Sequence, residues 1–454
     1  MTAPVAVVGG GVAGLAAAHR LVERGVRDVV LLEASDRLGG SIATERRGGF
    51  TIEAGADSFL TEKPWAAELC ERLGVSLVGT REGERRTYVV HDGRIEPLPE
   101  AFLLLAPTDL RAFAVSSLFS WRGKLRMALD LLLPRRADAA DESLAHFVRR
   151  RFGREALERV AEPLVSGIYT ADAERLSLAA TMPRFRELER KYRSVIRGLR
   201  ASAGASRAAG ARYSLFATPA DGMGALVEAL ARRLPEGVVR LRSPVGTLAH
   251  DGATWRLRAG GEALAVDALV LAAPAWTAGP LLEPVDPALG RLLGEIEYAS
   301  SATVTLAYPS AEVPQLRGFC FVVPAVERRA LIACTWASRK FPGRAPEGHE
   351  LVRAFVGGAL RPDLLARDDD ALVEVVRGEL RALAGITAAP ELVRVHRHRL
   401  AMPQYVVGHL ERVAAIEARA AAFTALALAG AAYRGVGVPD CVRSGAAAAD
   451  QVLD

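Results

Sequence analysis

The sequence predicts an α/β fold that combines a split parallel sheet, a mixed sheet and a helical subdomain. The chain begins with an apolar strand, Val5 to Val8, followed by a glycine-rich turn and an apolar helix. Buried strands of the same kind return at 267–274 and 426–430, so the first sheet draws on distant segments. Residues 99–219 have a helical pattern, and residues 290–400 alternate short strands with a helix.

The turn after the first strand has the spacing G-x-G-x-x-G, formed by Gly9, Gly11 and Gly14. A second apolar strand ends in Glu33, nineteen positions after Gly14. In this context the glycines permit a tight turn, close approach of a pyrophosphate and close helix packing, while the helix N-terminus offers N–H groups to phosphate. Glu33 is placed to accept hydrogen bonds from a ribose. The motif predicts a dinucleotide site, with a chance glycine turn as the alternative.

The segment after Glu33 indicates which dinucleotide binds. Arg37-Leu38-Gly39-Gly40 follows the second strand at once, where a further glycine turn is unusual for a nicotinamide domain. It resembles the R-x-G-G segment of flavoproteins of the amine-oxidase type, which runs along the FAD. An ordinary loop with two glycines is the alternative.

Composition limits the class of protein. The chain has 454 residues, 50% hydrophobic and 24% charged, as expected for a globular protein with two or three units. The net charge of +5 comes from dispersed arginines, which suits an acidic small substrate or an anionic membrane face and does not indicate nucleic acid. Four widely spaced cysteines fit a reducing compartment. We expect neither a signal peptide nor a transmembrane helix, because no basic region precedes the first strand and no uncharged apolar run reaches about 18 residues.

A glycine-rich segment near the C-terminus lies between a strand and a helix. Its sequence, from Gly430 through Tyr433 to Cys441, resembles the G-x-x-Y-x-G-V-G-x-x-D-C segment of oxygen-dependent porphyrinogen oxidases, which include protoporphyrinogen and coproporphyrinogen III oxidases. Three more segments resemble that family: Gly55–Phe59, in which Ala56 replaces the usual proline; Gly167–Ser177; and Met402–Arg412. The resemblance covers nearly the whole chain.

The resemblance implies a Rossmann-type FAD-binding domain of residues 1–80, 220–290 and 408–454. It also implies a substrate domain of residues 81–98 and 291–407 and a helical subdomain of residues 99–219. Val245 is expected to meet the adenine through its backbone. The residues implied at the FAD are Gly9, Gly10, Gly11, Val12, Ala13, Gly14, Glu33, Ala34, Arg37, Gly40, Gly55, Ala56, Asp57, Ser58, Val245, Gly430, Val436, Gly437 and Val438.

The resemblance also implies a site for a flat tetrapyrrole with acidic side arms. Arg86 is expected to hold a propionate, and Arg85 is the alternative if the alignment is offset by one. The carbonyl of Gly167 is expected to face the N–H groups of the macrocycle. An apolar slot is assigned to four further residues, for which ordinary core packing is the rival interpretation: Phe319, Val322, Thr335 and Phe355.

The implied chemistry is hydride transfer from a meso carbon to flavin N5, with reoxidation by O2 to hydrogen peroxide, in three rounds. We predict no catalytic side chain, because the cofactor supplies the chemistry and the protein positions the reactants. No metal is expected, since His396 and His398 alternate on a strand without other ligands nearby in sequence.

The expected partners are the tetrapyrrole and O2, with no nucleic acid; a homodimer and hand-off of the product to ferrochelatase are left open. We expect a cytoplasmic protein, with peripheral contact at the inner face of the cell membrane as a further hypothesis. That hypothesis rests on 111–133, where apolar and basic residues interleave, although helix packing explains the pattern equally well. Residues 198–212, rich in Gly, Ala and Ser, are predicted to form a mobile loop.

The substrate is the least determined part of the prediction. Protoporphyrinogen IX is favoured, with coproporphyrinogen III as the alternative. Three segments, 86–90, 333–336 and 437–441, look more like the coproporphyrinogen branch. Two rivals from other classes are a flavin amine oxidase and a flavin-binding scaffold without catalysis.

Overall fold

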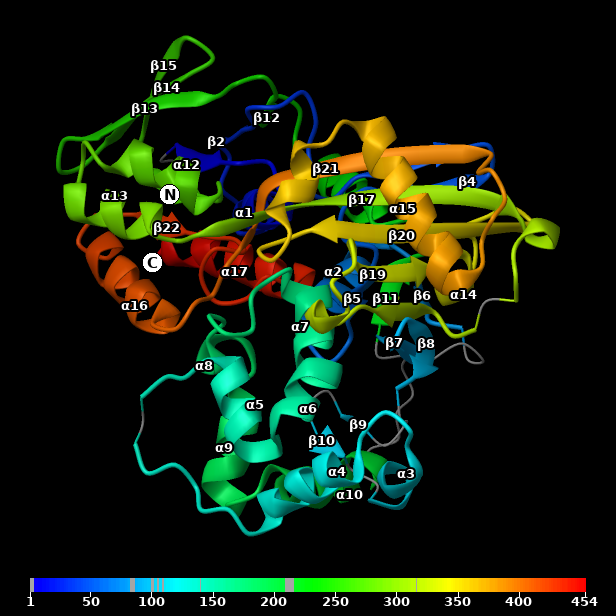
Figure 1. Cartoon of the computed structure of the whole chain (residues 1–454). Helices are drawn as coiled ribbons and strands as arrows, with labels where there is room; N and C mark the ends of the chain where they lie inside the picture. Colours follow the sequence, from blue (N-terminus) through cyan, green and yellow to red (C-terminus); the bar gives the residue numbers. More distant parts are fainter. Residues whose placement is uncertain are drawn as a thin grey trace.

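A computed structural model describes residues 4–81, 86–98, 102–103, 106–107, 110–138, 140–208, 216–315 and 317–454. Figure 1 shows a parallel sheet beside a larger mixed sheet, with a group of helices extending below both. We call this group, from α3 to α10, the helical part. None of the described helices combines the length and apolarity needed to cross a membrane.

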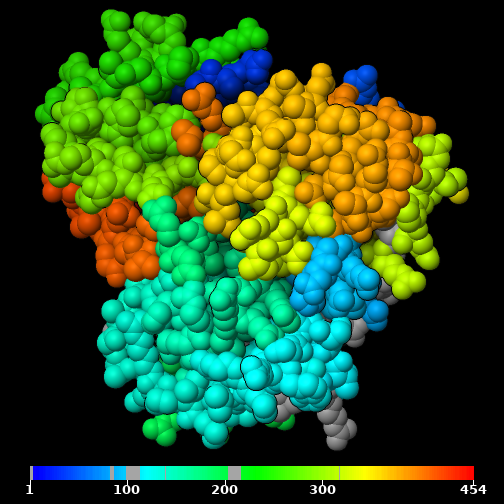
Figure 2. All heavy atoms as spheres, viewed as in Figure 1, coloured from blue at the N-terminus to red at the C-terminus, as the bar shows by residue number. Residues whose placement is uncertain are grey.

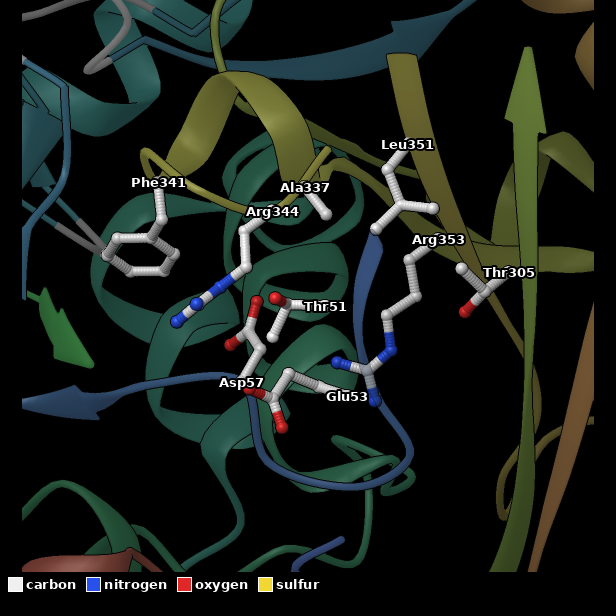
Figure 3. A pocket seen from close by; sticks show the side chains of 9 residues that line it. All are labelled: Thr51, Glu53, Asp57, Thr305, Ala337, Phe341, Arg344, Leu351 and Arg353. Atoms are coloured by element: carbon white, nitrogen blue, oxygen red, sulfur yellow. The ribbon is translucent and has the colours of Figure 1, made fainter. Parts of the chain in front are cut away.

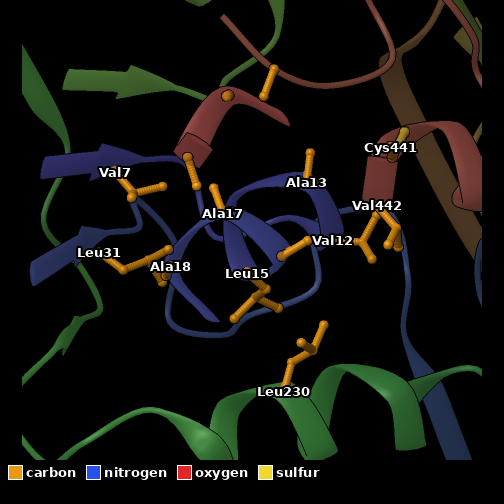
Figure 4. Close-up of a cluster of buried hydrophobic side chains, with 14 of the residues drawn as sticks. Val7, Val12, Ala13, Leu15, Ala17, Ala18, Leu31, Leu230, Cys441 and Val442 are labelled. Carbon is orange, nitrogen blue, oxygen red and sulfur yellow. The ribbon is translucent and has the colours of Figure 1, made fainter. Parts of the chain in front are cut away.

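The parallel sheet has five strands in the order β12-β2-β1-β16-β22. Strands β1 and β16 are buried along their whole length, as expected where both faces of a parallel sheet are covered. Alternate residues of the sheet pack against α1, α2, α11 and α17 on one face (Figure 4) and against α12, α13 and α16 on the other. The bounds are β1 Val5–Val8, β2 Val29–Leu32, β12 Val239–Arg240, β16 Ala268–Leu271, β22 Leu426–Leu428, α1 Val12–Glu23, α2 Trp65–Leu73, α11 Gly224–Arg233, α12 Ala275–Leu282, α13 Pro287–Gly294, α16 His409–Ala420 and α17 Val438–Gln451.

The mixed sheet has seven strands in the order β21-β17-β20-β19-β18-β7-β8. All neighbouring strands within this sheet are antiparallel except β18 and β7, which run parallel to each other. One face packs on α15, Asp369–Ala384, through residues such as Val304, Ala354 and Cys334. The next residues along each strand therefore point to the other face. The bounds are β7 Thr87–His91, β8 Arg94–Pro97, β17 Tyr298–Pro309, β18 Cys320–Val322, β19 Leu331–Trp336, β20 His349–Gly357 and β21 Leu392–Pro403.

The helical part packs on that second face. Val322 and Ala333 of the sheet are buried in one cluster with Phe147 and Val165 of the helices. The helical part also contains a buried ion pair, between Arg151 and Asp130 at 1% and 0% side-chain exposure. The bounds are α3 Leu110–Val115, α4 Trp121–Ala128, a 3₁₀ turn at Leu129–Leu131, α5 Leu144–Phe152, α6 Arg154–Ala156, α7 Glu162–Tyr169, α8 Leu178–Thr181, α9 Pro183–Tyr192 and α10 Val195–Ala208.

The predicted mobile loop at 198–212 is wrong over most of its length. Residues up to Ala208 lie in α10, whose first turn is anchored by the buried side chains of Val195, Ile196 and Leu199. Alanine and arginine favour a helix strongly enough to offset the glycines and serines once that turn is docked. Residues 209–212 lie outside the described part of the chain.

The other described elements are short strands and helices that connect these layers. Their bounds are β3 Thr44–Arg47, β4 Phe50–Glu53, β5 Phe59–Leu60, β6 Leu77–Gly79, β9 Phe102–Leu103, β10 Ala106–Pro107, β11 Phe216–Pro219, β13 Val245–His250, β14 Trp255–Ala259, β15 Glu262–Val266 and α14 Ala337–Lys340.

Candidate functional site

The first glycine turn has the geometry of a phosphate site. Gly9 has φ +107°, and a Cβ at Gly14 would lie 1.8 Å from the Gly9 carbonyl oxygen. A Cβ at Gly11, in contrast, would meet no described atom within 4 Å. Helix α1 follows Gly11 with no side-chain cap from the described residues and no acidic side chain in its first turn. The residues present therefore fit a pyrophosphate, because space and backbone N–H groups coincide at this helix end.

The Glu33 carboxylate is held at the end of β2 by backbone donors. Gly10 N donates to its Oε2 at 2.6 Å, and Ser35 N donates to its Oε1 at 2.8 Å. The Glu33 carbonyl accepts from Ser243 N at 2.8 Å, which places Val245, two residues further on, near the same end of the sheet. The ribose and adenine contacts of Glu33, Ala34 and Val245 stay predictions.

Arg37 shapes the second glycine loop. Its guanidinium donates to the carbonyls of Gly40 at 2.6 Å, Ile42 at 3.1 Å and Leu38 at 3.2 Å. The loop is tied to the first turn, since Gly39 N donates to the Gly10 carbonyl at 2.8 Å. The side chain thus stabilises the loop along which the FAD is expected to run.

The C-terminal turn provides a second helix N-terminus beside the first. Gly430 has φ +112°, its N–H donates to Ser444 Oγ at 2.9 Å, and its Cβ position lies 3.9 Å from Ala13. Helix α17 begins at Val438 after Gly437, with no side-chain cap from the described residues. Unlike α1, α17 has an acidic residue in its first turn, Asp440, whose carboxylate accepts from Lys63 Nζ at 2.6 Å. Motifs at the two ends of the chain therefore bring two helix ends close together.

The mixed sheet holds the predicted flavin turn at residues 54–58 from one side. The Ala54 carbonyl accepts from His398 Nε2 at 2.8 Å, Arg353 at 2.9 Å and Thr303 Oγ1 at 3.1 Å. Burial lowers the pKa of His398, so its imidazole is neutral and donates from Nε2. His398 is therefore used to hold the turn.

Asp57 of that turn pairs with Lys340, a residue that sequence reasoning missed. Lys340 Nζ lies 2.9 Å from Asp57 Oδ2 and 3.1 Å from Ser58 Oγ. Burial favours the neutral acid, but Lys340 and Arg353 outweigh it and lower the pKa of Asp57 to about 2. The ammonium also lies over the rings of Phe216 at 5.1 Å and Phe319 at 5.8 Å.

Charged side chains surround a small cavity beneath this turn (Figure 3). The cavity of about 10 Å³ is lined by Glu53, Asp57, Arg344 and Arg353, among others. Burial raises the pKa of Glu53, while hydrogen bonds from Thr44 and Met223 N oppose that shift. The cluster supports the turn from below, and sequence spacing gives no means of finding it because its members come from distant segments.

The residues predicted to bind the substrate converge on the face of the mixed sheet that meets the helical part. Across this face Val322 pairs with Ala333 and Ala333 with Phe355. A Cβ at Gly167 of α7 would lie 3.5 Å from Val322 Cγ1. The apolar cluster that includes Val322 is also contacted by Phe355 and by Val436 of the C-terminal turn. One cluster therefore connects the predicted slot with a predicted flavin residue.

Arg86 and Phe319 lie side by side at the end of this face. Phe319 N donates to the Arg86 carbonyl at 3.2 Å, and the Arg86 side chain is exposed. Thr335 pairs with Cys320, the residue after Phe319, and lies on the same strand as Ala333, which pairs with Val322. Arg85, the alternative to Arg86, lies outside the described residues. The contacts of these residues with a substrate stay predictions.

All four cysteines are free thiols. Burial raises the pKa of Cys320 to about 11, so the thiol beside Phe319 stays protonated at neutral pH. It is therefore no nucleophile.

Comparisons with known proteins agree with this geometry. A family model of flavin containing amine oxidoreductases matches residues 12–453. The chain is 35% identical to coproporphyrinogen III oxidase of Bacillus subtilis (strain 168), covering 99% of this chain and 97% of that protein. It is 29% identical to the chloroplastic protoporphyrinogen oxidase of Nicotiana tabacum, covering 91% and 78%. A crystal structure of a candidate protoporphyrinogen oxidase from Exiguobacterium sp. 255-15 matches with a TM-score of 0.88 and 32% identity, covering 100% and 99%.

The matched residues run from the first residue of α1 to beyond the end of α17, so they include both helices that begin at the candidate site. FAD is therefore the cofactor, and the chain belongs to the family of flavin containing amine oxidoreductases.

Proposed function

We propose that this protein uses FAD and O2 to oxidise a porphyrinogen to the porphyrin. The observation that supports this most directly is an apolar cluster that includes Val322 and is contacted both by Phe355 of the predicted slot and by Val436 of the C-terminal glycine-rich segment. A flat apolar macrocycle fits a slot of this composition, and Arg86 at its end suits an acidic arm. The names of the relatives point to the same class of substrate.

In this proposal the side chains bind and orient the reactants. The bound FAD supplies hydride acceptance and reaction with O2. The slot residues hold the macrocycle against the flavin and exclude water. Arg86 pairs with a propionate, and the exposed backbone at Gly167 faces the ring N–H groups. Lys340 and Arg353 hold the turn at Asp57 and Gly55 in place. This proposal includes the binding assignments of all predicted site residues. It also includes the division of the chain into three domains.

The relatives change the balance between the two porphyrinogens. The prediction from the family resemblance was protoporphyrinogen IX, with coproporphyrinogen III as the alternative, although the segments 86–90, 333–336 and 437–441 look more like the coproporphyrinogen branch. Identity is higher to the coproporphyrinogen III oxidase than to the protoporphyrinogen oxidase of Nicotiana tabacum. We therefore propose coproporphyrinogen III as the better substrate of the two and protoporphyrinogen IX as the second.

The test is aerobic turnover of each porphyrinogen by the FAD-loaded protein, followed by porphyrin fluorescence. We expect Arg86→Ala to raise KM for both substrates with a smaller change in kcat, and Arg86→Lys to recover part of the loss. Faster turnover of protoporphyrinogen would reverse the substrate order. No porphyrin from either substrate, with oxidation of a primary or secondary amine instead, would replace this proposal with an amine oxidase.

We also propose peripheral contact of the helical part with an anionic lipid surface. Figure 2 shows this part as the lower lobe of the molecule. Along α4 and the turn after it, Trp121, Leu125 and Leu132 are 72%, 68% and 79% exposed. The charged residues of 121–135 are basic except Asp130, which is buried against Arg151. Exposed apolar side chains at helical spacing beside basic ones are typical of a helix that lies in a membrane interface.

A further inference from the structure

Two side chains of the segment 402–412, Tyr405 and His409, contact the turn 431–435 of the C-terminal glycine-rich segment. The Tyr405 hydroxyl donates to the Ala431 carbonyl at 2.6 Å and accepts from Gly435 N at 2.8 Å. His409 Nε2 lies 2.8 Å from the Tyr433 carbonyl. Three backbone groups of the turn 431–435 are therefore satisfied by two neighbouring side chains.

The two rings form one rigid unit. Their centroids are 3.9 Å apart with an interplanar angle of 14°, and the residues are 1% and 0% exposed. Burial lowers the pKa of His409, and the Tyr433 carbonyl can only accept, so the neutral ring donates from Nε2. Its Nδ1 is buried without a partner in the described structure, a cost that the Nε2 contact must offset.

The same segment also contacts the region expected to hold the substrate. Ser177 N donates to the Tyr405 carbonyl at 2.7 Å, and Gln404 Nε2 donates to the Tyr169 carbonyl at 3.2 Å. Tyr169 ends α7, the helix of Gly167. One short segment therefore connects the end of α7 with the turn that leads to α17.

We propose that Tyr405 and His409 are positioning residues that hold the turn 431–435, and with it the N-terminus of α17, against the flavin ring. This proposal rests on the proposed flavin contacts of Val436 to Val438. Backbone N–H groups at a helix N-terminus favour negative charge nearby. Correct placement of this helix end should therefore favour the reduced, more negative flavin, and a loosened turn should disfavour it.

The test compares Tyr405→Phe with a matched control, Tyr433→Phe, in the FAD-loaded protein. The Tyr433 hydroxyl is also buried but has no partner in the described structure, so its removal costs no hydrogen bond. We expect Tyr405→Phe to lower the preference for reduced flavin about tenfold, which makes the two-electron midpoint potential more negative by about 30 mV. The control should leave the potential unchanged.

A second readout needs no cofactor. In the apo-protein, hydrogen exchange at Gly435 N–H should be at least about tenfold faster in Tyr405→Phe, the loss expected for one buried hydrogen bond. His409→Gln, which keeps a donor, should retain the wild-type potential, whereas His409→Leu should shift it as Tyr405→Phe does.

An unchanged potential in Tyr405→Phe overturns the proposal, even if hydrogen exchange accelerates, because the contacts would then be structural only. An equal shift in Tyr433→Phe also overturns it. Turnover of porphyrinogens by the wild type is measured separately. Its absence together with the predicted shift in potential would contradict the proposed function and leave this inference standing.

Discussion

Gly445 of α17 lies against Ala13 of α1, so closely that a Cβ at 445 would be 2.0 Å from the Ala13 carbonyl oxygen. The contact joins the helix of the first motif to the helix of the last. It brings together two helix N-termini that are separated by more than four hundred residues in the sequence.

We expect Gly445→Ala to separate α1 from α17 and to destabilise the protein by about 1–3 kcal/mol, as overpacking does. FAD affinity should fall as well, because both helix ends move. Gly378→Ala is the matched control: this glycine is exposed within α15, and a Cβ there meets no described atom within 4 Å. It should stabilise by about 0.5–1 kcal/mol. Urea unfolding and FAD titration measure both effects, and equal stability of the two variants would contradict the packing argument.

Asp57 should contribute to stability above pH 4 and lose that contribution in acid. Its pKa is about 2 in the folded protein, below its ordinary value of 3.8. The stabilisation, about 2 kcal/mol, is therefore complete above pH 4 and is lost as the pH falls toward 2. Asp57→Asn should flatten the acid range of the curve of unfolding free energy against pH.

Asp57→Asn should also destabilise at pH 7, because the largely buried Lys340 loses its anionic partner. A double-mutant cycle with Lys340→Gln isolates the pair from other changes. An unchanged acid limb in Asp57→Asn would show that other carboxylates cause the acid sensitivity.

Arg151→Met should destabilise the protein by about 3–5 kcal/mol, because it leaves Asp130 buried without its cation. Among the residues that the structure describes, Asp130 would keep Ser194 Oγ and Ile196 N as donors. The control is Arg154→Met, which breaks an exposed pair with Glu158 one helical turn away. Thermal unfolding should separate the two variants clearly. Similar midpoints would mean that the buried pair contributes little.

Gly167→Leu should block porphyrinogen oxidation without loss of FAD. A Cβ at this position meets Val322 at ordinary van der Waals distance, so Gly167→Ala should be tolerated, whereas a leucine side chain would extend into the slot. We expect kcat/KM to fall more than about tenfold in the leucine variant and less than about threefold in the alanine variant. Normal activity with a normal FAD content in Gly167→Leu would place the substrate elsewhere.

The surface of α4 should bind vesicles that contain phosphatidylglycerol and not those of phosphatidylcholine alone. Trp121→Ser with Leu125→Ser should weaken this binding more than about tenfold, because two large apolar side chains lose their burial in lipid. Val326→Ser with Leu360→Ser, at 52% and 41% exposure outside the helical part, is the control. If the first pair instead converts a dimer to a monomer in gel filtration, the surface is a contact between two copies of the chain.

Periodicity and glycine spacing were enough to predict the parallel sheet and α1, and the helix predicted among the strands of 290–400 is α15. The helical tail at 198–208 was not predicted. Its glycines and serines favour a loop locally, whereas the buried start of α10 favours continuation of the helix. Local propensity cannot include that term, because it depends on a packing partner.

The candidate site also has parts that the sequence predicted and parts that it did not. Glycine motifs at Gly9 to Gly14 and at Gly430 to Gly437 were evident from the sequence, because they meet local needs: a positive φ, space for a ligand, and free helix ends. Lys340 stands in no motif, and its pairing with Asp57 arises only because α14 packs beside the turn at residues 54–58.

The sequence by itself therefore determined the class of fold, the cofactor and the family, because those depend on short-range patterns. Only the tertiary structure decided which side chains support the site: Lys340 and Arg353 beneath one turn, Tyr405 and His409 behind the other. The physical reason is that hydrogen bonds and ion pairs act over a few ångströms in space, whatever the distance along the chain.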